Sequence, residues 1–144
     1  MGVPGGLRMM ARIAFLLLSV MLAAPVLADT KTPLPEEQHI NEQLIAAQAG
    51  EILRNTCPTI VARMFVVWEK AFMLRQYAID KGYNEDEVKA FLKDPAQKAR
   101  VKAAAEAILA SSGAKPGDIP SYCAAGKAEI AKGTLLGQII RSTE

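Results

Sequence analysis

The 144-residue chain has only one histidine, His39, and two cysteines. One histidine cannot supply the repeated ligands of a zinc site, and it would have to be the base for any Ser or Cys nucleophile. The chain also lacks a Gly-x-Ser-x-Gly sequence, and Gly126-Lys127 lacks the glycine spacing and the following Ser or Thr of a phosphate loop. We therefore expect no catalytic residue, no cofactor and no metal, and a protein that is not an enzyme.

The acidic clusters have a simple interpretation. Glu36 and Glu37 lie close to His39, and the acids of 85–87 lack EF-hand spacing. Both groups lie at the start of a predicted helix. Negative charge at a helix N-terminus is favourable, so we expect these residues to be structural. An enzyme with an unrecognised acid–base site is a minor alternative.

Residues 1–28 have the composition of a secretory signal peptide. Two arginines and no acid precede the apolar run 13–22, and Val26 and Ala28 supply small residues two positions apart at a cleavage site. The run is shorter than the ~20 residues that cross a bilayer, which favours cleavage over an anchor. We expect a periplasmic or secreted protein that begins near Asp29 and has no stable membrane insertion.

The chain also lacks an excess of one charge once this segment is removed. It contains 17 basic and 15 acidic residues, and two of the basic ones, Arg8 and Arg12, lie within 1–28. A balanced chain has no net charge to hold a phosphate backbone or an anionic lipid surface. Nucleic acid is therefore not an expected partner, whereas another envelope protein is.

Cys57 and Cys123 form an even count in an exported chain, which indicates a disulfide. They are not in a Cys-x-x-Cys arrangement, so a redox-active pair is the less favoured alternative. A bridge would close a loop of roughly 65 residues and stabilise the fold by about 4 kcal/mol in the chain-entropy model.

The spacing of apolar residues is helical along most of the chain, and no stretch alternates long enough to predict a strand. Residues 29–35, with two prolines, are predicted to be an extended leader, and 36–144 a single helical domain. The predicted helices span about 36–56, 60–81, 84–92, 95–110 and 121–140. The expected fold is all-α, a small bundle or array of about five helices closed by one disulfide.

The second predicted helix is apolar on most sides, with Met64, Phe65, Trp68, Phe72 and Ile79 among its large side chains. A helix that is hydrophobic all round is normally buried. We therefore expect it to be the centre about which the other helices pack, with Trp68 in the core.

Several residues mark helix ends. Gly82 is expected to adopt a left-handed conformation after the second helix, and Asn84 and Asp94 are expected N-caps of the next two. Gly133 and Gly137 have the spacing of close helix packing.

Three segments carry a resemblance to a known group: NTCPTIVARMF at 55–65, GYNEDEV at 82–88 and YCAAGKAEIAK at 122–132. Together they resemble a domain of unknown function found in small exported proteins of Rhodobacter-type alphaproteobacteria, over about residues 38–141. The resemblance implies a helical fold, a bridge between Cys57 and Cys123 and a Gram-negative periplasm. It implies no activity.

Two functional hypotheses follow. The first is a non-enzymatic binding or interaction module of the cell envelope, since no catalytic constellation is recognisable. The second is a small periplasmic chaperone activated by acid, because titration of 15 acidic residues would leave a strong positive charge and could expose apolar helix faces.

Overall fold

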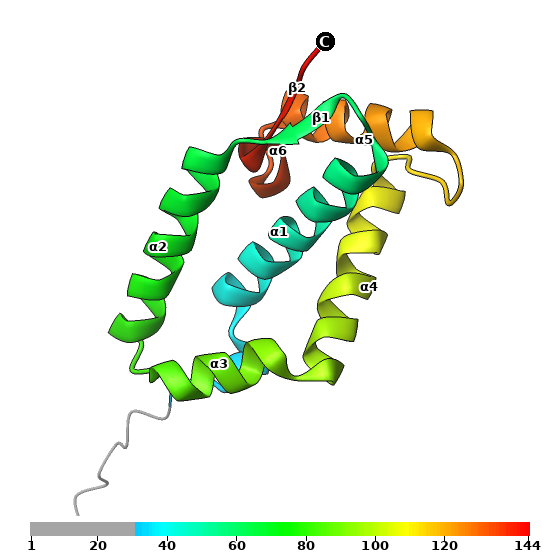
Figure 1. The fold of residues 1–144 in the computed structure, drawn as a ribbon. Helices are drawn as coiled ribbons and strands as arrows, with labels where there is room; N and C mark the ends of the chain where they lie inside the picture. Colours follow the sequence, from blue (N-terminus) through cyan, green and yellow to red (C-terminus); the bar gives the residue numbers. More distant parts are fainter. Residues whose placement is uncertain (1–30) are drawn as a thin grey trace, which may run out of the picture. The chain divides into compact units, whose positions relative to one another are not determined.

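In this computed structural model the described residues are 31–144; the predicted signal peptide, and the first two residues of the predicted leader, lie outside them. The elements follow in the order η1 (Leu34–Glu36), α1 (Gln38–Thr56), β1 (Ile60–Ala62), α2 (Met64–Asp80), α3 (Glu85–Lys93), α4 (Pro95–Ser111), α5 (Ile119–Lys132), α6 (Leu135–Ile139) and β2 (Ile140–Ser142) (Figure 1). The all-α class with one disulfide is confirmed, and the only sheet of residues 31–144 has two short strands.

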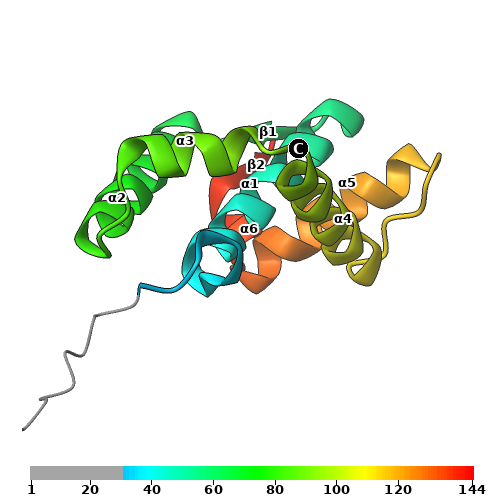
Figure 2. The same cartoon turned by 90° about the horizontal axis from the view of Figure 1, so that it is seen from below.

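The central helix is α1. It packs against α4, α5 and α6, and Ala49 and Leu53 have no exposed surface. Both views show it between α2 and α4 (Figures 1 and 2). Its small residues allow this position: a Cβ added to Gly50 would lie 3.3 Å from Cδ1 of Ile139. The prediction that the second helix is central was therefore wrong.

A short antiparallel ladder replaces the predicted start of the second helix. Ile60 pairs with Ser142, and Ala62 pairs with Ile140. The backbone N–H of Arg63 donates to the Ile139 carbonyl at 2.8 Å, so the chain is extended until α2 begins at Met64. The prediction of no strand was wrong because β-branched Ile60 and Val61 found a partner strand far along the chain.

The disulfide joins the C-cap of α1 to α5. Cys57 is fully buried, and its Cα lies 5.2 Å from that of Cys123. Cys57 is the C-cap of α1, so the bridge begins at the end of this helix. It therefore fastens the central helix to the C-terminal part of the fold.

The predicted last helix is divided in two. Gly133 has φ +65° and ends α5 in a left-handed cap, after which α6 turns back. A Cβ on Gly137 would lie 2.0 Å from the Glu129 carbonyl oxygen, so only glycine fits between the two helices. The close packing predicted for Gly137 is confirmed, whereas Gly133 serves as a cap.

Glu129 is the buried carboxylate of this hairpin. It accepts hydrogen bonds from the hydroxyls of Ser112 and Thr134, and its carboxylate lies 3.5 Å from Nζ of Lys132. Burial opposes its ionisation, but the two hydroxyls and the ammonium outweigh burial and lower its pKa below the usual value. Because Ser112 follows α4 and Thr134 precedes α6, the ionised carboxylate ties these segments together.

Helix ends between α2 and α4 are confirmed as predicted. Gly82 has φ +82°, the Asn84 side chain accepts from the Glu87 N–H at 2.8 Å, and the Asp94 side chain accepts from the Ala96 N–H at 2.9 Å. These caps fix the turns that set α2, α3 and α4 around α1.

Candidate functional site

The outward face of α2 carries large apolar side chains that contact water. Phe65 is 84% exposed, Trp68 62% and Phe72 67%, and Ile79, about two helical turns after Phe72, is 46% exposed. Their spacing places all four on one side of the helix, and we call them the α2 stripe. The expectation that Trp68 is buried was wrong.

The stripe is flanked by two further exposed side chains, Met64 and Met73. Within it, the rings of Phe65 and Trp68 meet edge to face with centroids 5.9 Å apart. This arrangement is favoured for aromatic pairs.

The opposite side of α2 holds the helix against the rest of the fold. Val66 and Val67 pack against the core cluster that contains the disulfide, while Leu74, Tyr77 and Ala78 belong to a second cluster around Leu34 and Phe91. These side chains make the contacts of α2 with the core, so the face that carries Trp68 points away from the core.

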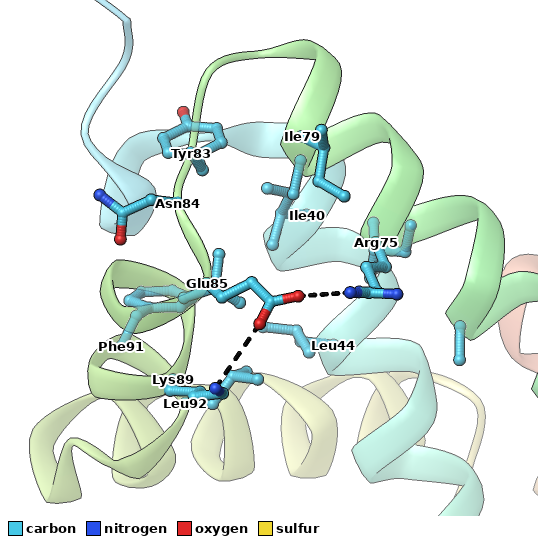
Figure 3. Close-up of a pocket in the computed structure, with 14 residues that line it drawn as sticks. Ile40, Leu44, Arg75, Ile79, Tyr83, Asn84, Glu85, Lys89, Phe91 and Leu92 are labelled. Atoms are coloured by element: carbon cyan, nitrogen blue, oxygen red, sulfur yellow. Dashed lines mark hydrogen bonds and ion pairs between the residues drawn. The ribbon is translucent and has the colours of Figure 1, made fainter.

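An apolar groove opens beside this helix. It has a volume of about 390 Å³ and lies between α1, α2 and α3 (Figure 3). Its apolar lining consists of Ile40, Leu44, Ala71, Leu74, Ala78, Ile79, Val88, Phe91 and Leu92. Since Ile79 also belongs to the α2 stripe, groove and stripe adjoin at this residue, and we call the two together the α2 surface.

One ion cluster borders the groove. Arg75 of α2 donates to Glu85 of α3, and Nζ of Lys89 lies 3.7 Å from the same carboxylate (Figure 3). The hydrogen bond from Arg75, then the positive charges of Arg75 and Lys89, lower the pKa of Glu85. All three side chains are more than half exposed. The cluster lies at the edge of the groove, and its two positive charges and one negative charge leave a net charge of only one.

The start of the described chain packs against Tyr83, which lines the groove, and against Tyr77. The Tyr83 hydroxyl donates to the Thr32 carbonyl, and the Tyr77 hydroxyl donates to Glu37 at 2.7 Å. That hydrogen bond to Glu37 is the first cause of a raised pKa at Tyr77. Lys31 pairs with Glu87 and lies 5.0 Å from the centre of the Tyr83 ring. These contacts anchor segment 31–37 below α2 and α3.

The residues examined for chemistry in the sequence do not come together. His39 is exposed in the first turn of α1 and stacks beside Tyr77, with ring centroids 4.5 Å apart. The acids of 85–87 form the first turn of α3. Between residues 31 and 144, no group of three or more His, Cys, Asp or Glu side chains is placed to hold a metal ion.

The basic side chains of α3 and α4 have separate partners. Lys89 lies near Glu85, Lys102 lies 3.8 Å from Glu106, and Arg100 donates to Asn41. Nothing unites these side chains into one positive surface.

A buried polar network was missed by the sequence prediction. Asn41 donates to the Leu34 and Glu37 carbonyls, and its oxygen accepts from Gln97 at 3.0 Å and from Arg100. Every member has a partner, so the network joins η1, α1 and α4 and offers no free group for chemistry. Polar residues in helix interiors, such as Asn41 and Gln97, gave no signal that they meet.

The fold and the site define a small helical protein, closed by one disulfide, that displays an apolar helix face and groove. No helix of residues 31–144 is long and apolar enough to cross a membrane. The chain belongs to a family of unknown function, DUF5333, whose model matches residues 32–141. Neither the curated proteins nor the solved structures contained a match.

Proposed function

We propose that this protein is a non-enzymatic interaction module that binds a polypeptide partner through the α2 surface. The observation that carries the proposal is the exposure of Phe65, Trp68 and Phe72 on one helix face. Aromatic residues and methionine are enriched in protein interfaces, where they supply most of the binding energy.

The size of the exposed area supports this function. If an aromatic side chain offers about 200 Å², the exposed parts of Phe65, Trp68 and Phe72 amount to roughly 400 Å² before Met64, Met73 and the groove are included. Monomeric proteins rarely expose apolar patches beyond a few hundred Å² unless the patch has a binding role.

We further propose that the module works outside the cytoplasm, in the cell envelope or beyond it. The Cys57–Cys123 bridge supports this location because disulfides persist in oxidising compartments. Its loss under the reducing conditions of a cytoplasm would remove a main support of the fold.

Affinity capture tests the function. The tagged protein and a Phe65→Gln/Trp68→Gln/Phe72→Gln variant are compared in extracts of the producing cells, and each captured protein is then titrated in purified form. We expect one stoichiometric partner that binds the unaltered protein and loses at least tenfold in affinity for the variant. Glutamine keeps helix propensity while removing apolar area.

An Ile108→Gln/Ile119→Gln variant serves as the matched control, since both isoleucines are exposed and lie on α4 and α5. If the control loses the partner as fully as the triple variant, or if the triple variant retains full affinity, the proposed docking surface is wrong.

The acid-activated chaperone is a second candidate, and one observation favours it. The ionised Glu129 connects the end of α4 to the start of α6, so its protonation weakens this connection and frees apolar surface at the core. A chaperone would suppress aggregation of many unrelated clients at low pH and none at pH 7. Capture of one partner at neutral pH, with no holding activity in acid, contradicts it.

A further inference from the structure

We infer that the α2 surface is covered by a second copy of this chain, in an antiparallel pair with a two-fold axis beside Phe72. The inference rests on the proposed function and names the partner of that same surface. A two-fold pair requires a surface that is complementary to itself. Three features of α2 meet this requirement.

The first feature is the distribution of shape along the helix. Phe65 and Trp68 project from its N-terminal half, whereas Ile79 in its C-terminal half belongs both to the stripe and to the groove lining. Phe72 lies at the midpoint of Met64–Asp80. If one copy is turned end for end about Phe72, the projecting aromatic half of each α2 lies over the half of the other α2 that borders the groove.

The register follows from this axis. Phe65 of one copy lies over Ile79 of the second, and Trp68 lies over Gln76 beside the groove mouth. The two Phe72 rings meet at the axis. Because α2 has 17 residues, the pair is about 25 Å long.

The second feature is area. The three aromatic side chains expose roughly 400 Å², and Met64, Ile79 and the groove wall add to this. A stable interface buries about 800 Å² on each partner. One helix face with its groove thus approaches the area that a dimer needs, and its register sets Phe65 against Ile79 and Phe72 against Phe72 of the opposite copy.

The third feature is charge. The charged residues of α2 are Glu69, Lys70, Arg75 and Asp80, which balance one another. Arg75, the charged residue of α2 that lines the groove, is held by Glu85. Two copies of this surface therefore approach without net repulsion, while an anionic surface or a strongly charged peptide finds no complementary field here.

Sedimentation velocity over a wide range of concentration tests the pair, with Trp68 as an internal reporter because it is the only tryptophan. We expect a reversible dimer, and a blue shift of tryptophan emission as the dimer forms. Phe72→Glu places two carboxylates at the axis and is expected to raise the dissociation constant on the order of 30-fold or more.

A charge-complementation experiment controls for nonspecific damage. Phe72→Lys is expected to weaken self-association as Phe72→Glu does, and an equal mixture of the two variants is expected to regain the dimer, since opposite charges then meet at the axis. Both variants keep their circular dichroism, because Phe72 is 67% exposed.

A protein that stays monomeric at every concentration overturns the inference, as does a dimer that Phe72→Glu leaves unchanged or a mixture that stays monomeric. The proposed function fails on a different result: a captured partner that still binds the Phe65→Gln/Trp68→Gln/Phe72→Gln variant. A monomer that binds another polypeptide through α2 would therefore contradict the dimer and leave the interaction module intact.

Discussion

Helices α1 and α2 are similar in length and both rich in apolar residues, yet one is central and the other displays its largest side chains to water. Along α1 the inward positions include Ala46, Ala49 and Gly50, which let neighbouring helices approach from several sides. Along α2 the outward positions include Phe65, Trp68 and Phe72, whose side chains are too large for neighbouring helices to approach closely on all sides. Side-chain size, as well as apolar content, decides which helix occupies the centre.

Among the changes considered, loss of the disulfide at the end of the buried helix α1 should have the largest effect on the free energy of unfolding. A Cys57→Ser/Cys123→Ser variant removes a crosslink with a sequence separation of 66 and is expected to lower the free energy of unfolding by about 4 kcal/mol. Chemical denaturation of the variant and of the oxidised parent protein measures this change. A loss below about 1 kcal/mol would show that α1 is held in place without the bridge.

The next largest effect should come from α1 itself. Leu53→Ala creates a cavity at a fully buried position and is expected to cost about 3 kcal/mol. Phe72→Ala removes a larger side chain from α2 but is expected to cost less than about 1 kcal/mol, because that ring is mostly in water. Equal losses in urea denaturation would remove the distinction between the two helices.

Glu129 should give a smaller, pH-dependent contribution. Its pKa is lowered in the folded protein from an ordinary value of 4.5, so its stabilisation is present above that value and disappears as pH falls through the folded pKa. Glu129→Gln is expected to cost about 1 to 2 kcal/mol at neutral pH and to reduce the loss of stability in acid.

The free energy of unfolding, measured from pH 7 downward, tests this expectation. Glu42→Gln is the control, since Glu42 is an exposed residue of the same charge on α1. If the free energy of unfolding falls equally with decreasing pH in the parent protein and in Glu129→Gln, other carboxylates govern the loss of stability in acid.

Local signals in the sequence predicted much of the fold. Pro58, Gly82, Asn84 and Asp94 each impose a conformation on one or two residues, so the ends of α1, α2 and α3 and the start of α4 could be predicted without knowledge of tertiary contacts. The disulfide pairing was equally constrained, because Cys57 has only Cys123 as a partner.

Features that depend on distant contacts could not be predicted in this way. The strand at 60–62 exists only because 140–142 lies beside it, and three residues are too few to show an alternating pattern. The candidate site was missed for a related reason: the spacing of Phe65, Trp68 and Phe72 is the same for a core face and for a docking face. Only the packing of Val66 and Val67 on the other side distinguishes the two.

The smallest effect on stability is expected where the largest side chains are changed. The Phe65→Gln/Trp68→Gln/Phe72→Gln variant replaces three exposed aromatic residues with good helix formers, and its free energy of unfolding as a monomer should differ from that of the parent monomer by less than about 1 kcal/mol. Binding of an apolar fluorescent dye should nevertheless fall strongly, because the α2 stripe is the main exposed apolar surface of the described chain. Ile108→Gln/Ile119→Gln should change neither quantity by much. A triple variant that unfolds readily would mean that these rings support the fold, and α2 would then resemble α1 in its energetics despite its exposure.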